Sequence, residues 1–192
     1  MESSIVYFED ISTSHTEEVF RLARKRAIEL GIKDVIVAST SGETAVKAVK
    51  FFEGFNMVAV GLSSGLREPN VSLFTEDKRK IVENAGGKVL LAAPAFAGVG
   101  GAPREQSHNP QNGDIIADTL RIFGQGMKVT CEIVLEAADA GLVRSNVPLI
   151  SIAGTGKWKG ADTAVVVSPV NSNRFFEIKV HEIICKPRLW LS

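Results

Sequence analysis

The stretch "DVIVASTSGETAVKAVKFFEG" (residues 34–54) holds the change of pattern on which the fold depends. Residues 34–39 carry a continuous apolar run, which predicts a buried strand. Residues 42–54 then place apolar side chains at helical spacing. The expected buried face of that helix consists of Ala45, Ala48, Val49 and Phe52. Between the two elements, "STSGET" (39–44) joins the carboxyl end of a strand to the amino end of a helix.

The turn 39–44 admits two interpretations. Unpaired backbone N–H groups and the positive end of a helix favour an anion such as a phosphate. Gly42 lets a ligand approach the backbone, while the carboxylate of Glu43 counts against an anion unless its side chain turns away. The hydroxyl donors of the turn are Ser39, Thr40, Ser41 and Thr44. The alternative is ordinary Ser/Thr capping of the helix, and the residues alone favour neither.

The alternation of strand and helix continues along the chain. Apolar runs predict strands, first to fifth, at residues 34–39, 56–61, 88–93, 147–154 and 162–169. Amphipathic patterns predict helices at residues 12–31, 42–54, 75–86, 113–124 and 127–142. This order indicates a mainly parallel, doubly wound α/β sheet. We expect one domain over residues 1–192, because no internal repeat or second domain is visible.

Two further segments have the character of strands. Residues 4–8 form a short apolar run. Residues 174–184 alternate, with Phe176, Ile178 and Val180 on one face and charged or polar side chains on the other. Such alternation predicts a half-exposed strand near a sheet edge.

The composition narrows the class of protein. Lys plus Arg and Asp plus Glu both number 22, so the net charge is zero, which argues against a broad nucleic-acid surface. No apolar stretch approaches the roughly 20 residues that span a bilayer, and residues 1–4 lack the features of a secretion signal, so we expect a cytoplasmic protein without a membrane partner. Neither cysteine, Cys131 or Cys185, lies at a zinc-ligand spacing, and the histidines form no metal or catalytic cluster.

A second glycine-rich segment, "GTGKWKGAD" (154–162), follows the fourth predicted strand. It is a near miss to a dinucleotide fingerprint, but its spacing is wrong and a strand follows where a helix is required. A Rossmann-type NAD site is therefore not expected. The segment could form a backbone wall beside a ligand, with Lys157 and Lys159 near an anion, or it could be a solvated connection.

The stretch "GLSSG" (61–65) matches the G-x-S-x-G pattern of hydrolases, with Ser63 as the nucleophile. That pattern needs a helix immediately after the serine, whereas Pro69 intervenes and the next helix is expected near Thr75. We therefore interpret the segment as part of the rim above the sheet.

Residues 94–113 form a long predicted loop, and loops of this length are often lids or binding loops. Phe96 could stack on a planar ligand and His108 could contact one. The alternative for both side chains is a surface position without such a role.

These motifs together resemble the C-terminal domain of pyruvate kinase. In that domain a turn of the form S-T/N-S-G-x-S/T holds the phosphate of a sugar bisphosphate effector, and residues 39–44 match it position by position, with Glu43 at the variable position. The chain is more similar to a stand-alone, mostly archaeal group of such proteins. The segments that carry this resemblance are "YFE" (7–9), "HTEE" (15–18), "STSGETA" (39–45), "GQGMKV" (124–129), "AADAGLV" (137–143) and "IAGTGKWKGADTA" (152–164).

The resemblance implies a three-layer α/β/α fold. Its mainly parallel sheet has strand order 3-2-1-4-5, with the fifth strand antiparallel and short extra strands besides. The sheet then grows in both directions from the first strand, and ligands of open α/β sheets bind at the carboxyl ends of strands at such a switch point. The two glycine-rich segments would form the two sides of one crevice.

Members of this group resemble flavin nucleotide binders, so the resemblance implies FMN as the cofactor of a protein with an unassigned reaction. The expected cofactor-binding residues are Ser39, Thr40, Ser41, Gly42, Glu43, Thr44, Gly61, Leu62, Ser63, Gly154, Thr155, Gly156, Lys157 and Asp162. Pyruvate kinase activity is excluded because the chain has no room for the catalytic barrel. The alternatives are a non-catalytic sensor of a sugar phosphate or nucleotide, which would signal through a homo-oligomer, and a weak hydrolase that uses Ser63.

Overall fold

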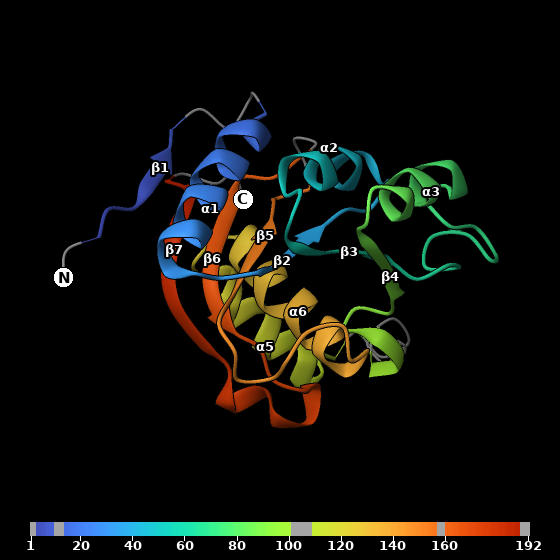
Figure 1. Ribbon diagram of the computed structural model, residues 1–192. Coiled ribbons are helices and arrows are strands. Elements are labelled where there is room, and N and C mark those ends of the chain that lie inside the picture. Colours follow the sequence, from blue (N-terminus) through green and yellow to red (C-terminus); the bar gives the residue numbers. More distant parts are fainter. Residues whose placement is uncertain (1–2, 10–13, 101–108, 157–159, 189–192) are drawn as a thin grey trace.

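The apolar runs of the sequence assemble into a seven-stranded sheet of order β1-β7-β6-β5-β2-β3-β4 (Figure 1). A computed structural model describes residues 3–9, 14–100, 109–156 and 160–188. The strands are β1 (Val6–Phe8), β2 (Asp34–Ala38), β3 (Asn56–Leu62), β4 (Lys88–Ala92), β5 (Leu149–Ala153), β6 (Thr163–Ser168) and β7 (Lys179–Pro187).

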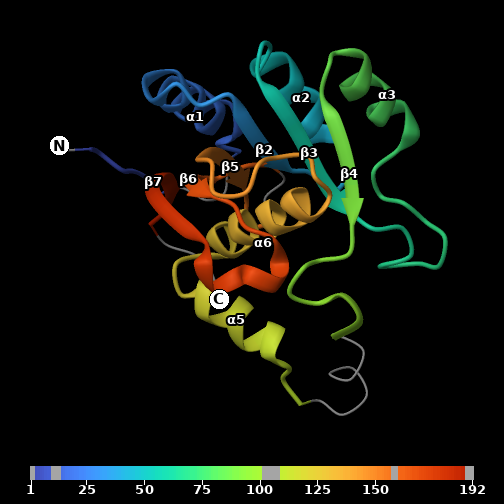
Figure 2. The ribbon, with the colours of Figure 1, turned by 60° about the horizontal axis from the view of Figure 1, so that its bottom comes forward.

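Helices cover both faces of this sheet (Figure 2). They are α1 (Thr16–Leu30), α2 (Glu43–Phe51), α3 (Glu76–Asn84), α5 (Asn112–Arg121) and α6 (Gln125–Asp139), with short 3-10 turns η1 (Gly98–Gly100) and η2 (Ser172–Glu177). Helices α1, α2 and α3 lie on one face of the sheet. Helix α6 lies on the other face, and α5 packs against α6. Across the described ranges, none of these helices combines the length and the apolar character needed to cross a membrane.

The strand order confirms the predicted fold class. The segment β4-β3-β2-β5-β6 has the order 3-2-1-4-5 in the count of the predicted strands, and β6 is antiparallel to both of its neighbours. The pairs β3/β4, β2/β3, β2/β5 and β1/β7 are parallel. The carboxyl ends of β2 and β5 therefore meet at one edge of the sheet, between the helices of its two faces.

Successive side chains of one strand reach different layers of the core. Val35 and Val37 belong to the buried cluster that also contains Phe20 of α1. Ile36, between them, belongs to the cluster that contains Val134 of α6. Because both faces of the central strands are covered, these strands are apolar throughout, which is the pattern that the sequence shows.

One predicted strand is wrong in its first part. Residues 172–177 form the 3-10 turn η2, and β7 begins only at Lys179. Residues 172–177 have no strand to pair with, because Lys179 already pairs with Ser168, the last residue of β6. Phe176, expected on the same face as Val180, is 89% exposed. The position near an edge is confirmed, since among the described strands the three-residue β1 alone lies beyond β7.

The packing of α2 leads to a stability prediction. Phe52 is 1% exposed, and its ring lies 5.5 Å from Phe20, 6.0 Å from Phe51 and 5.8 Å from Phe55 between centroids. We expect Phe52→Ala to lower the free energy of unfolding by about 3–5 kcal/mol in urea titrations. The control Phe176→Ala should change it by less than about 0.5 kcal/mol. Equal effects would contradict this arrangement of the core.

Candidate functional site

The turn 39–44 follows β2 and leads directly into α2. The buried Ser39 is tied to both neighbours, because its backbone N–H donates to the carbonyl of Val60 at 2.8 Å and its Oγ accepts the N–H of Ala45 at 3.1 Å. Gly42 is the N-cap residue, and its carbonyl accepts the N–H of Val46 at 3.0 Å. The hydroxyl of Ser39 thus satisfies one of the unpaired N–H groups at the start of α2.

The other N–H groups of the turn have no acceptor among the described residues. Within the part of the chain that the structure describes, the backbone N–H groups of residues 40–44 donate to no carbonyl or side chain. Gly42 has φ of +84°, in the left-handed region, and such residues build the concave groups of N–H donors that bind anions. The turn therefore offers five consecutive donors at the positive end of a helix.

Gly42 is required at its position for two reasons. Its positive φ is unfavourable for any residue with a side chain. In addition, a Cβ there would lie 2.9 Å from the Cβ of Lys78 and 3.0 Å from Cε1 of Phe74. The backbone of the turn thus packs directly against the start of α3.

The carboxylate of Glu43 is engaged by a neighbouring cation. Nζ of Lys78 lies 3.5 Å from Oε1 of Glu43 and donates to the carbonyl of Ser41 at 3.1 Å. The negative charge that counted against an anion site is therefore turned toward α3 and partly compensated there. An exposed ion pair of this kind contributes little to stability.

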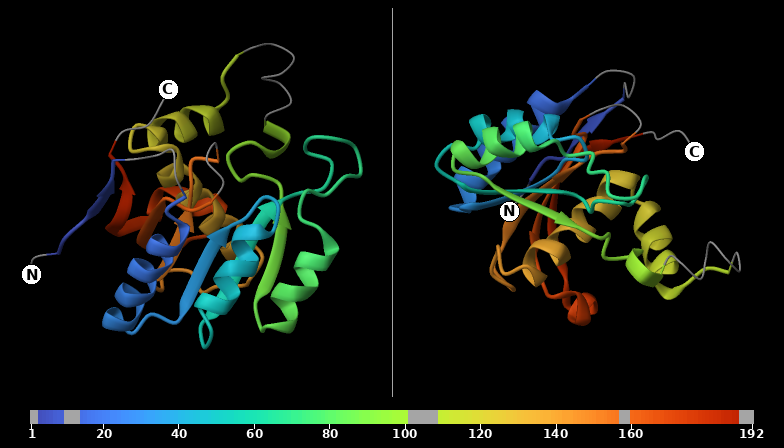
Figure 3. Two further views of the ribbon diagram at one scale, coloured as in Figure 1. Left: turned by 90° about the horizontal axis from the view of Figure 1, so that it is seen from above. Right: turned by 90° about the vertical axis from the view of Figure 1, so that its right-hand side faces the viewer.

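The second glycine-rich segment lies beside the turn, as expected from the strand order. Val37 of β2 pairs with Ile152 of β5, so Gly154 follows β5 next to the point where Ser39 follows β2. In the left view of Figure 3, α5 lies beyond the carboxyl ends of the strands. The turn 39–44, Gly154 and α5 therefore lie at the same ends of the strands.

Asp162 holds the segment after β5 in place. Its Oδ2 accepts the N–H of Thr155 at 2.8 Å, and its Oδ1 accepts the hydroxyl of Thr163 at 2.6 Å. Burial raises the pKa of Asp162, although the hydrogen bonds from Thr163 and Thr155 act in the opposite direction. Both carboxylate oxygens serve the loop itself, so Asp162 shapes the wall of the crevice.

Close packing fixes Gly154 of this segment, and backbone conformation fixes Gly156. A Cβ on Gly154 would lie 2.1 Å from the carbonyl oxygen of Gly160, and Gly156 has φ of +75°. The N–H of Ala161 donates to Oγ1 of Thr16 at 3.0 Å, which links the segment to the first turn of α1. This role of Thr16 was not predicted. The candidate Lys157 lies outside the described residues.

The end of β3 contributes a tightly packed rim. A Cβ on Gly61 would lie 2.8 Å from Cδ2 of Leu91 and 3.0 Å from the carbonyl oxygen of Ser39. Leu62 ends the strand, and the N–H of Ser63 donates to the carbonyl of Ala92 at 2.9 Å. The next helix, α3, begins only at residue 76, so the strand–serine–helix geometry of a hydrolase is not formed.

A group of charged residues on α6, two of them buried, was not predicted from the sequence. Lys128 and Glu132, 8% and 5% exposed, form an ion pair one helical turn apart, and Glu136 follows on the same face. The segment after β4 covers them, because the N–H of Ala95 donates to Oε1 of Glu136 at 3.1 Å and that of Phe96 to Oε1 of Glu132 at 3.3 Å. The spacing of Lys and Glu in "KVTCEIVLE" (128–136) was the available signal.

The ring of Phe96 is held by contacts within the protein. It packs edge-on against Phe175 at 5.4 Å between centroids, and Nζ of Lys128 lies 5.6 Å from its centroid. The other candidate of this loop, His108, lies outside the described residues. Phe96 thus covers the charged residues on α6, and it lies near the carboxyl end of β4.

No family model matches the chain. Among solved structures, a pyruvate kinase from Cryptosporidium parvum has 12% identity and a TM-score of 0.42, over 84% of this chain and 24% of that one. A Cryptosporidium parvum pyruvate kinase in complex with ADP has 11% identity and a TM-score of 0.41, over 91% and 24%. The chain thus spans about a quarter of these enzymes, and at such TM-scores the likeness carries no argument about activity.

Glu136 leads to a prediction on pH dependence. Burial raises its pKa from 4.5 to about 8, and Glu132 adds to this, whereas the N–H of Ala95 and the charge of Lys128 lower it. Between pH 4.5 and about pH 8, Glu136 keeps its proton in the folded state and loses it in the unfolded state. The free energy of unfolding therefore falls as the pH rises. The loss from this group is at most about 1.4 kcal/mol per pH unit.

Glu136→Gln should remove this contribution. Urea titrations from acid to mildly alkaline pH should show a flatter stability profile for the variant than for the original chain. The control is Glu53→Gln, an exposed position beyond α2, which should leave the profile unchanged. Superimposable profiles for Glu136→Gln and the original chain would show that Glu136 is not buried in this way.

Proposed function

We propose that this chain binds a phosphorylated small molecule, most specifically FMN, at the carboxyl ends of β2 and β5. The observation that carries the proposal is the row of five backbone N–H groups in residues 40–44 without an acceptor in the described protein. Such donors at a helix start bind phosphate through hydrogen bonds and the helix dipole. The exposed residues Thr40 and Ser41 add hydroxyl donors.

In this proposal the remaining candidates contact the body of the ligand. Gly154, Thr155 and Gly156 would form the wall opposite the turn, and Asp162 would hold this wall in position. Gly61, Leu62 and Ser63 would form the rim on the side of β3. The tight packing at Gly61 and Gly154 supports this assignment, because it fixes the backbone at both sides of the turn.

The choice of FMN among phosphate esters rests on the sequence resemblance. A bound flavin would supply redox chemistry, and the protein would hold and orient it. In this scheme the turn binds the phosphate and Glu43 remains paired with Lys78, so the negative carboxylate stays away from the anion. We assign no acid or base for a substrate, and a sensor of another phosphate ester would use the same turn.

Comparison of two flavins tests the phosphate site. FMN and riboflavin share the ring system and differ in the phosphate. Because hydrogen bonds to a charged group contribute about 1.5–3 kcal/mol each, FMN should bind at least about tenfold more tightly than riboflavin in calorimetric titrations. Inorganic phosphate should weaken FMN binding. If FMN fails to bind while sugar phosphates bind, the sensor replaces the flavin protein; if no phosphate ester binds, the proposal is wrong.

A pair of glycine variants tests the shape of the turn. Gly42 and Gly54 have φ of +84° and +85°, but a Cβ on Gly54 would meet no atom within 4 Å. Gly42→Ala should reduce FMN affinity by at least about tenfold, because it distorts the row of N–H groups. Gly54→Ala carries similar backbone strain outside the turn and should retain the affinity.

Thr40→Val supplies a milder test in case Gly42→Ala does not fold. It removes one exposed hydroxyl, and the loss of one hydrogen bond should weaken FMN binding by about two- to tenfold. Unchanged affinity in both Gly42→Ala and Thr40→Val would contradict a phosphate site at this turn.

A further inference from the structure

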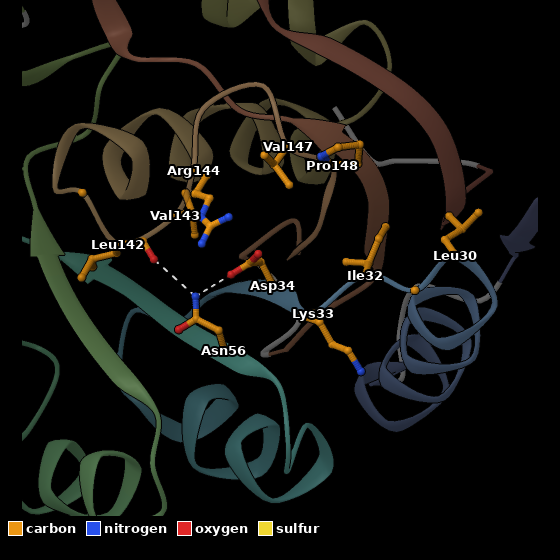
Figure 4. A pocket seen from close by; sticks show the side chains of 12 residues that line it. Leu30, Ile32, Lys33, Asp34, Asn56, Leu142, Val143, Arg144, Val147 and Pro148 are labelled. Carbon is orange, nitrogen blue, oxygen red and sulfur yellow. Dashed lines mark hydrogen bonds between the residues drawn. The ribbon is translucent and has the colours of Figure 1, made fainter.

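A cavity of about 670 Å³ lies at the opposite edge of the sheet from the turn 39–44 (Figure 4). It opens between the amino ends of β2 and β3, the end of α1 and the segment between α6 and β5. Its volume falls within the range of small-molecule sites, roughly 300–1,000 Å³. Because it lies at the amino ends of the strands, this cavity is separate from the proposed phosphate site.

The floor of the cavity carries two polar side chains held in fixed positions. Nδ2 of Asn56 donates to Oδ1 of Asp34 at 2.5 Å and to the carbonyl of Leu142 at 3.3 Å. These bonds use both N–H groups of the Asn56 amide. Among the described residues, Oδ2 of Asp34 and Oδ1 of Asn56 accept no hydrogen bond, so two acceptors remain for a ligand.

A cation lies across the cavity from these acceptors. Figure 4 shows the guanidinium of Arg144 pointing into the space above Asp34 and Asn56, whereas the side chain of Lys33 leads away from it. Arg144 forms no hydrogen bond or ion pair with the described part of the chain, and its nitrogens lie more than 4.0 Å from the carboxylate of Asp34. A negative and a positive group thus face one another without contact.

The remaining wall is aliphatic. Ile32 and Val143 are largely buried, and Val147 and Pro148 extend the apolar surface toward the solvent. This wall gives the site an apolar side next to its polar floor. A short hydrocarbon chain would be removed from water there, with a gain of about 25 cal/mol per Å² of apolar surface.

We propose that this cavity binds a small aliphatic carboxylate that carries an amino or hydroxyl group on the carbon next to the carboxylate. The carboxylate would pair with the guanidinium of Arg144, which can bind both oxygens at once. The amino or hydroxyl group would donate to Oδ2 of Asp34 and Oδ1 of Asn56. The hydrocarbon chain would contact the exposed side chains of Val147 and Pro148. Such a ligand fills the gap between the two opposite charges.

Titrations monitored by backbone amide NMR signals test the ligand class. L-leucine and 2-hydroxy-4-methylpentanoate present the two donor types, and the stronger binder identifies which one the cavity takes. The preferred compound should shift signals of residues 31–34, 56 and 141–148, which lie in or next to the cavity. Two matched compounds, 4-methylpentanoate without the donor and 3-methylbutylamine without the carboxylate, should each bind at least about tenfold more weakly.

Variants separate the assigned roles. Arg144→Met keeps a long side chain without charge and should weaken binding of the preferred compound by at least about tenfold. Arg144→Lys should restore part of the affinity, since it keeps the charge and loses the paired hydrogen bonds. Lys33→Met is the matched control and should bind like the original chain. FMN affinity should be unchanged in all three variants, because residues 33 and 144 lie at the amino ends of the strands and the proposed FMN site lies at their carboxyl ends.

Three results would overturn the inference. The first is the absence of localised shifts with both donor-bearing compounds at millimolar concentration. The second is equal binding of 4-methylpentanoate, which would show that Asp34 and Asn56 do not contact the ligand. The third is unchanged affinity in Arg144→Met. Because none of these readouts depends on flavin, failure here leaves the proposed FMN site untouched, and failure of the FMN site leaves this test intact.

Discussion

The parallel pairing of β2 with β5 joins the two halves of the sheet. The chain leaves β2 through α2 on one face and reaches β5 through α6 on the other, so no crossover connection covers the edge between these two strands. The register that places Val37 beside Ile152 also places the turn 39–44 beside the segment that follows Ala153. A switch point of this kind is where open α/β sheets bind their ligands. The position of the candidate site thus follows from the strand order, and the loops determine only its detailed shape.

At the turn itself, helix capping and anion binding prove to be compatible. Ser39 lies before the left-handed Gly42, and its hydroxyl reaches past it to the N–H of Ala45. One donor at the start of α2 is satisfied in this way, and the five preceding donors in residues 40–44 remain unpaired within the described chain. The cap stabilises the helix whose dipole would attract the anion. The two interpretations that the sequence left open therefore describe different N–H groups of one turn.

Features that depend on local sequence pattern were predicted. Features that depend on contacts between segments far apart in the chain were missed. Strands buried on both faces, such as β2, are evident from their apolar runs, and the resemblance supplied their order. Residues 174–178 alternate like a strand but have no partner beyond Ser168, which no local pattern reveals. Lys128 and Glu132 lie on the face of α6 that would be exposed without the segment at Ala95 and Phe96, more than 30 residues away in the chain. The cavity near Arg144 was missed because it forms between three chain segments.

The two edges of the sheet differ in their electrostatic character. Helices that follow parallel strands run back across the sheet, so α1, α2, α3 and α6 begin at the carboxyl edge of the strands and end at the amino edge. Their positive ends therefore lie at the carboxyl ends of the strands, where they would stabilise the phosphate that we propose for the turn 39–44. At the amino edge the helix ends are negative, so a carboxylate there needs a dedicated cation. Arg144 supplies it, and the same negative helix ends favour the amino form of the proposed ligand, whose ammonium would lie next to Asp34.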